Sequence, residues 1–144
     1  MKQELVNGHI LPLQLVIAIA AGRWGPSCCK ADLSALPIED KDDLVLLNVP
    51  EMIRNTHELK VALARGDGTL FALTEDGSPV PGFLDVNQSV VIAVTHGEEA
   101  LALDYSVGKE PRVVATHYEP GNLKWVEVAQ SFDDLLNILK LSAV

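Results

Sequence analysis

Aromatic residues and cysteines are both scarce in this chain. Only 5% of its 144 residues are Phe, Trp or Tyr, so a core has to be built mainly from Leu, Val, Ile and Ala. The cysteines Cys28 and Cys29 are adjacent, and neighbouring cysteines rarely bridge each other because the resulting ring is strained. They offer neither a disulfide framework nor the Cys-x-x-Cys spacing of zinc and redox sites, which favours two reduced thiols in a cytoplasmic protein.

Basic residues are also in short supply. The sequence has 11 Lys and Arg against 20 Asp and Glu, which gives a formal net charge of -9. A chain this acidic repels phosphate backbones, so we expect no direct binding to nucleic acid. The same charge would attract a basic protein and accelerate its encounter, although acidity alone also keeps a protein in solution.

The sequence contains no hydrophobic run long enough to span a membrane. The apolar stretch from Leu11 to Ala21 is eleven residues long and includes Pro12 and Gln14, whereas a spanning helix takes about 20 residues. The first residues lack the basic start and directly following apolar stretch of a signal peptide. We therefore expect a cytoplasmic protein without membrane contact, in which this stretch forms a core helix.

Recognisable motifs for catalysis and phosphate binding are missing. There is no Gly-x-Ser-x-Gly elbow, P-loop or dinucleotide-binding glycine pattern. The glycine-rich segment at residues 65–68 contains Asp67, which would repel a phosphate, so it predicts a turn. We therefore expect no catalytic residues and no cofactor.

The histidines do not have metal-binding spacing either. His9, His57, His96 and His117 are far apart, and none belongs to a His-x-x-x-His or His-x-Glu pattern. His96 and His117 fall on neighbouring predicted strands and could approach each other, but that would leave a metal ion short of ligands. We expect no metal site.

Helix signals are strongest at the two ends of the sequence. Pro12 suits a first helical turn and Gly22 suits a C-terminal stop. The segment 13–21 between them is apolar nearly all round, which predicts a helix that is covered on several sides. Trp24 follows and is expected to act as a lid on the core rather than as a ligand platform.

The C-terminal helix is the clearest local prediction. Ser131 can accept a hydrogen bond from the backbone of Asp134, in a Ser-x-x-Asp variant of the capping box. The following apolar residues have helical spacing and predict an amphipathic helix. They are Phe132, Leu135, Leu136 and Leu139.

The middle of the chain is less regular. Residues 44–47 predict a buried strand, and Asn48 can cap a short helix over residues 51–58 with Met52 and Ile53 facing inward. Residues 59–65 fit either a further strand or a continuation of that helix. Residues 70–74 predict another strand.

The second half of the chain predicts an antiparallel sheet. Residues 89–95 and 100–105 are strand-like and are joined by a short turn that contains Gly97, which is typical of a hairpin. Residues 111–116 and 124–128 predict two more strands. We expect one α+β domain over residues 1–144, with a central, mostly antiparallel sheet of about five or six strands flanked by helices.

Asp104 is the residue most suggestive of chemistry, because it places a carboxylate at the end of a hydrophobic strand, beside Tyr105. A catalytic carboxylate needs a second acid or base nearby, and the pattern identifies none. We favour a strand-end Asp that binds nearby backbone. The alternative is a small hydrolase that uses Asp104 with His96 or His117.

Acidic residues gather in the predicted loops and turns, where binding residues are often found. Each cluster alone is typical of a solvated face, but together they favour a site that binds a protein. The candidate partner-binding residues are Asp40, Asp42, Asp43, Glu75, Asp76, Glu98 and Glu99.

The second half of the chain also resembles a known family. The segments Ala102-Leu103-Asp104-Tyr105, Pro111-Arg112-Val113-Val114, Trp125 and Ser131-Phe132-Asp133-Asp134-Leu135-Leu136 occur in the order typical of the SUKH superfamily, Smi-Knr type. The similarity covers about residues 83–141, and it is looser around residues 11–24 and 49–52. Phe83 stands where relatives often have Trp.

The resemblance implies a fold and a role. It implies an α+β fold with a largely antiparallel sheet, and many bacterial members are immunity proteins that bind and neutralise a toxin, commonly a nuclease. Such a toxin tends to be basic because it must engage nucleic acid. The family has no shared catalytic residues to carry over to this sequence.

Three functions follow in order of preference. The first is an immunity protein, a monomer or weak homodimer, that inhibits a cognate basic toxin. The second is a non-enzymatic regulatory or scaffold protein, as some eukaryotic relatives of the family are. The third is the hydrolase built on Asp104.

Overall fold

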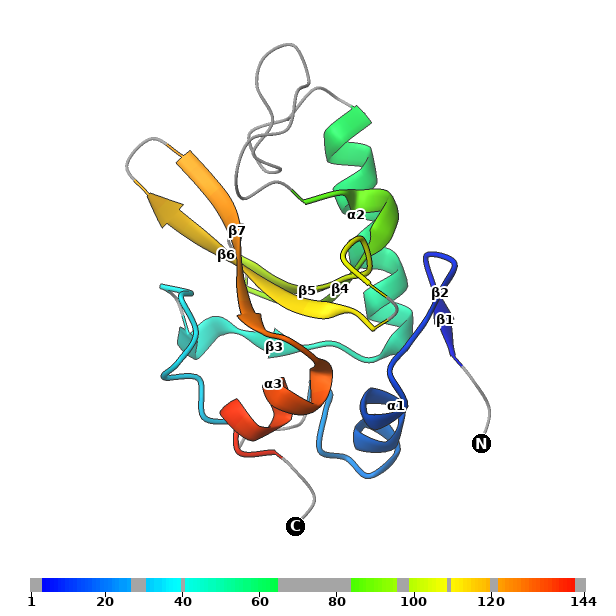
Figure 1. The fold of residues 1–144 in the computed structure, drawn as a ribbon, viewed down its shortest axis with the longest axis vertical. Coiled ribbons are helices and arrows are strands. Elements are labelled where there is room, and N and C mark those ends of the chain that lie inside the picture. The colour runs from blue at the N-terminus through cyan, green and yellow to red at the C-terminus, as the bar shows by residue number, and fades with distance from the viewer. Residues whose placement is uncertain are drawn as a thin grey trace.

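The computed structural model describes residues 4–26, 31–39, 41–64, 84–95, 99–108, 110–119 and 122–141 (Figure 1). Its helices are α1 (Leu13–Ala20), α2 (Val49–Ala64) and α3 (Phe132–Ile138), with short 3-10 helices η1 (Lys41–Asp43) and η3 (Val86–Gln88). Its strands are β1 (Leu5–Val6), β2 (His9–Ile10), β3 (Val45–Leu46), β4 (Ser89–Val94), β5 (Ala100–Asp104), β6 (Arg112–Glu119) and β7 (Asn122–Ala129). The adjacent cysteines, the predicted turn at residues 65–68 and the predicted strand at residues 70–74 lie outside the described residues.

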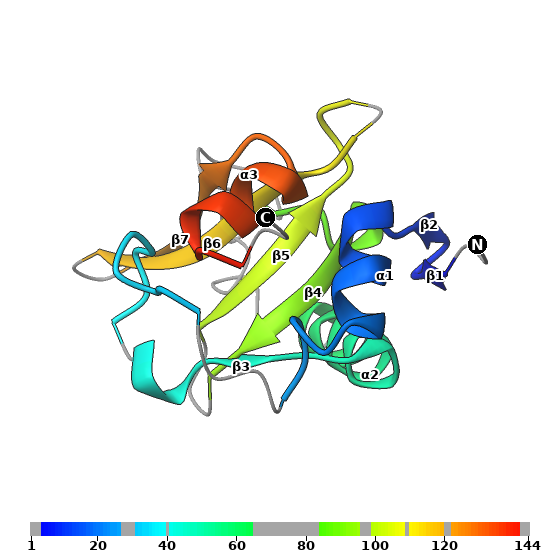
Figure 2. The same ribbon diagram turned by 90° about the horizontal axis from the view of Figure 1, so that it is seen from below.

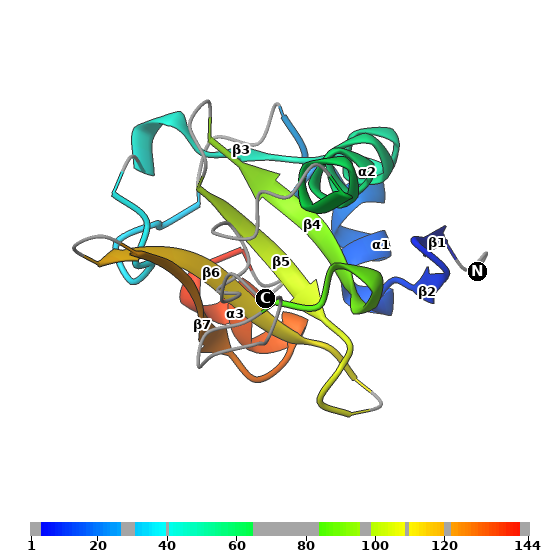
Figure 3. The same ribbon diagram turned by 90° about the horizontal axis from the view of Figure 1, so that it is seen from above.

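Strands β3 to β7 form one five-stranded sheet in the order β3-β4-β5-β6-β7, and every neighbouring pair is antiparallel. β1 and β2 form a separate hairpin. Helix α2 lies on one side of the large sheet, whereas α1 and α3 lie on the other (Figures 2 and 3). The predicted α+β class, the antiparallel sheet and the C-terminal helix are therefore confirmed.

A bulge in β4 shows how the sheet and α2 are joined. The register between β4 and β5 shifts between Val91 and Ala93, which disturbs the regular ladder there. The backbone N–H of Val91 donates to Thr56 Oγ1 on α2 at 2.9 Å, and the carbonyl of Ile92 accepts from Leu47 N at 2.9 Å. These backbone groups are buried, and an unpaired buried group would be costly, so Thr56 fixes α2 against the sheet.

The C-terminal helix follows the sequence prediction closely. Ser131 is its N-cap, and Ser131 Oγ accepts from Asp134 N at 3.2 Å. The predicted apolar stripe is buried, and Trp24 meets Phe132 edge-on with 5.2 Å between ring centroids. Trp24 is only 2% exposed, so the expectation that it covers the core is confirmed.

Two burial predictions are wrong. Helix α2 continues to Ala64, which settles the ambiguous segment as helix, and it turns Ile53 outward with 51% of its surface exposed while Met52 is buried. Adjacent residues on a helix point about 100° apart, so the two could not share one narrow inward face. Helix α1 buries only Leu15 and Ala18 fully, Val16 and Ile19 pack half-buried against the core, and Leu13 is 57% exposed, so the predicted cover on several sides is incomplete.

Candidate binding groove

A groove opens between the start of α1, the start of α3 and the connection from β5 to β6. It has a volume of about 360 Å³. Figure 2 shows α1 and α3 on the same side of the sheet, near the β5–β6 connection. The lining residues, called the groove from here on, are Ile10, Pro12, Leu13, Gln14, Tyr105, Glu110, Pro111, Ser131, Phe132 and Asp133.

One wall of the groove is apolar and open to solvent. Ile10 is 51% exposed and Leu13 is 57% exposed, while Phe132 is buried beneath. The segment 11–22, which includes all of α1, contains no charged residue. Exposed apolar side chains that gather in a concave site are typical of an interaction surface, whereas scattered ones need no explanation.

Tyr105 forms the wall that joins the N-terminal hairpin to the large sheet. Its hydroxyl donates to the Ile10 carbonyl at 2.8 Å, and its backbone N–H donates to the Gln88 carbonyl at 2.7 Å. Its ring stacks on His9, with ring centroids 4.4 Å apart. Burial raises the pKa of Tyr105 above its already high ordinary value, in keeping with a neutral hydroxyl that donates to Ile10.

Asp104 holds the two ends of the β5–β6 connection together. Asp104 Oδ1 accepts from Ser106 N at 3.0 Å and from Ser106 Oγ at 2.6 Å, while Asp104 Oδ2 accepts from Arg112 Nε at 2.8 Å. The Asp104 side chain is 3% exposed and Arg112 is 30% exposed. The carboxylate therefore shapes the loop that carries Tyr105 and Glu110, in agreement with the predicted strand-end role that binds nearby backbone.

The rim of the groove is acidic. Glu110 lies on the β5–β6 connection and Asp133 lies in the first turn of α3, and both are exposed. Among the lining residues that the structure describes, these two alone carry a formal charge at neutral pH. The groove thus combines an apolar floor with carboxylates at its edge, which suits a ligand that has an apolar part and a positive charge.

The predicted partner-binding residues that the structure describes do not line the groove. Asp43 is half-buried in η1, and Glu99 is 6% exposed, with its Oε2 accepting from Glu39 N at 2.7 Å. Glu99 therefore serves a local structural contact and does not present a solvated carboxylate. The other candidates, Asp40, Glu75, Asp76, Glu98 and the side chain of Asp42, lie outside the described residues.

The strand register argues against a direct Asp104–His117 pair. Asp104 pairs with Arg112 and Leu101 pairs with Ala115, so His117 lies five residues along β6 from the partner of Asp104. At about 3.3 Å per residue this separation is about 16 Å, which is far beyond hydrogen-bond reach. His96, the other suggested partner, lies outside the described residues.

The described part of the chain contains neither a grouped set of metal ligands nor a helix that could span a membrane. There, no three His, Cys, Asp or Glu side chains are grouped so that they could hold a metal ion. Nor does any described helix have the length and apolar character needed to cross a membrane.

Sequence reasoning missed the groove, although one signal was present. An apolar segment without any charge predicts burial, but the same pattern also occurs where a helix leaves one side open for a partner. The acidic rim had no such signal, because Glu110 and Asp133 are far apart in the sequence and meet only through the fold.

Comparison of the chain with protein-family models, curated proteins and solved structures found no match. The resemblance to the SUKH superfamily therefore stays a prediction. A function has to be argued from the groove, the charge and the fold.

Proposed function

We propose that this protein binds a basic protein toxin in the cytoplasm and neutralises it, as an immunity protein of the SUKH type does. The observation that carries the proposal is the pair of exposed apolar side chains, Ile10 and Leu13, at a groove whose charged residues, among those described, are both acidic. Interfaces between proteins are centred on buried apolar side chains and surrounded by polar ones. An acidic rim adds selectivity for a positively charged partner.

The net charge supports the same class of partner. With a charge of -9, the chain attracts a basic protein over a long range and repels nucleic acid. A nuclease toxin presents a positive surface to its substrate, so an acidic protein that covers this surface would block substrate access as well as bind. The proposed complex contains one copy of the chain, because two copies at one site would repel each other.

The experiment is co-expression with the product of a neighbouring gene that encodes a toxin. We expect host survival at equal dosage, and loss of toxin activity in vitro at a one-to-one ratio. The affinity should fall as salt is raised, because charge attraction contributes to binding. An unrelated acidic protein of similar charge serves as the control.

Two results would remove the proposal. One is a toxin that still kills its host at equal dosage and stays active with the protein in excess. The other is a genomic neighbourhood without any toxin gene, which would favour the regulatory or scaffold role instead.

A further inference from the structure

We infer that the groove binds a short segment of the partner in which a large apolar side chain stands beside an arginine or lysine. This inference rests on the proposed function and names what the groove itself recognises. It commits to a basic polypeptide as the occupant, on the basis of volume, charge and the exposed apolar wall.

The volume limits what can enter. Small-molecule sites are commonly about 300–1,000 Å³, and the groove, at about 360 Å³, lies at the lower end of this range. A space of this size suits one or two side chains rather than a helix or a folded element. The occupant is therefore a local feature of a larger partner.

The apolar wall specifies the first side chain. Ile10 and Leu13 expose about half of their surface, and Phe132 forms apolar surface below them. Covering these side chains with a leucine-sized group removes apolar area from water at about 25 cal/mol per Å². A wholly polar segment would not remove this apolar surface from water and would gain no affinity from it.

The rim specifies the second side chain. Glu110 and Asp133 are the two charged residues among the described lining residues, and their carboxylates would repel an anionic ligand and attract a guanidinium or ammonium group. A second copy of the chain is disfavoured as the occupant for the same reason, because it carries a charge of -9 and brings the same two carboxylates to the contact.

The test uses capped tetrapeptides as probes and the intact protein as the receptor. The peptides are Gly-Leu-Arg-Gly, Gly-Leu-Gln-Gly without the charge, and Gly-Ala-Arg-Gly without the large apolar group. Backbone amide shifts are followed by NMR at low salt. We expect the first peptide to bind with a Kd near the millimolar range, with the largest shifts at Ile10, Leu13, Tyr105 and Asp133, and each of the others to bind at least threefold more weakly.

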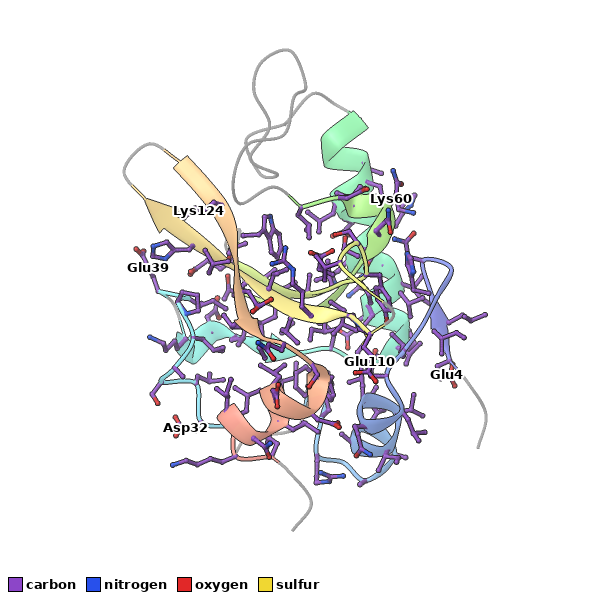
Figure 4. All side chains as sticks on the ribbon, in the orientation of Figure 1. Glu4, Asp32, Glu39, Lys60, Glu110 and Lys124 are labelled. Atoms are coloured by element: carbon purple, nitrogen blue, oxygen red, sulfur yellow. The ribbon has the colours of Figure 1, made fainter. Side chains whose placement is uncertain are left out.

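The contribution of charge is tested with one double variant in the groove and one matched double variant outside it. Glu110→Gln with Asp133→Asn should weaken the first peptide by at least about threefold, because both carboxylates that attract its arginine lose their charge. Glu39→Gln with Glu58→Gln changes the net charge equally at exposed residues outside the groove, and should leave its Kd within twofold. Figure 4 shows that Glu39 and Glu110 lie well apart.

The contribution of the apolar wall is tested with one single variant in the groove and one matched single variant on α2. Leu13→Gln should weaken the peptide with both side chains, whereas Ile53→Gln, at a similarly exposed residue on α2, should not. Amide spectra of all four variants check that the fold is retained.

Several outcomes would overturn the inference. Equal binding of the three peptides, shifts that avoid the groove, or equal effects of groove and control variants would each do so. Concentration-dependent shifts of the groove amides without peptide, together with a dimer in sedimentation equilibrium, would assign the groove to a second copy. The peptide test needs no toxin, so the two proposals can fail separately. If the protein protects its host from the toxin but does not bind the peptide, only the inference about the groove is overturned. If the protein binds the peptide but does not protect its host, only the proposed function is overturned.

Discussion

Asp104 and Arg112 stand directly opposite each other on β5 and β6, and their side chains form an ion pair of 2.8 Å between Arg112 Nε and Asp104 Oδ2. Arg112 Nη1 also lies 3.7 Å from Glu127 Oε1 on β7. The guanidinium therefore links β5, β6 and β7. The pair closes the base of the loop that carries Tyr105 and Glu110. The geometry of the groove therefore depends on a carboxylate that does not line it.

Replacement of Asp104 by Asn should destabilise the protein by about 2 kcal/mol, because a buried carboxylate that accepts three hydrogen bonds is lost. Arg112→Gln should cost a similar amount, because it leaves the buried Asp104 carboxylate without its guanidinium partner. Urea unfolding of both single variants and of the double variant measures the coupling between the two residues. A double variant whose loss equals the sum of the two single losses would show that they do not interact.

Substitution of the two leucines of α1 should change the free energy of unfolding by very different amounts. Leu15 is fully buried, so Leu15→Ala should cost about 3 kcal/mol in the free energy of unfolding. Leu13→Gln should change it by no more than about 0.5 kcal/mol, because Leu13 is 57% exposed. Thermal and urea unfolding check both. A large loss for Leu13→Gln would mean that the outer side of α1 contributes to the core and is not a free surface.

The sequence predicts the sheet better than the helices. The hairpin of β4 and β5 and the next two strands follow from β-branched runs separated by turn residues, because local composition determines such strands. The sequence does not determine the length of α2, because Leu59, Val61 and Leu63 alternate as a strand would. In the structure α2 continues to Ala64, and Leu59 packs partly buried against the core on this helix.

The groove could not be predicted in the same way. Ile10, Glu110 and Asp133 come from three distant parts of the chain, and their meeting depends on the packing of α1 and α3 beside the β5–β6 connection. The acidic loops were predicted as the partner site from local charge alone. Glu99 shows the weakness of that reasoning, because a charged residue in a turn can be buried and can accept a backbone hydrogen bond.

Loss of the α3 cap should destabilise the protein modestly. Ser131→Ala removes the acceptor of the Asp134 N–H, and an N-cap change of this kind costs about 1 kcal/mol. Ser131→Asn keeps an acceptor without adding charge to the groove and should retain most of the stability. Urea midpoints of the two variants measure the difference. Equal losses for Ala and Asn would assign the effect to packing rather than to capping.

Asp32 should give the protein a stabilising contribution that is lost only in strong acid. Hydrogen bonds from the Ser34 hydroxyl and backbone, and then the ammonium group of Lys140 at 3.3 Å, lower the pKa of Asp32 from 3.8 to about 2. Because the folded pKa lies below the unfolded one, the contribution is complete above about pH 4 and declines as pH falls through 2.

Carboxyl NMR titration distinguishes the two causes of the low Asp32 pKa. Ser34→Ala removes the hydroxyl hydrogen bond and should raise the pKa of Asp32 more than Lys140→Met does, because Lys140 is exposed and its charge is screened by water. Added salt should raise the pKa slightly in the wild type and in Ser34→Ala, but not in Lys140→Met. A larger pKa rise in Lys140→Met than in Ser34→Ala would show that the ion pair, rather than the Ser34 turn, holds the Asp32 carboxylate in its charged form.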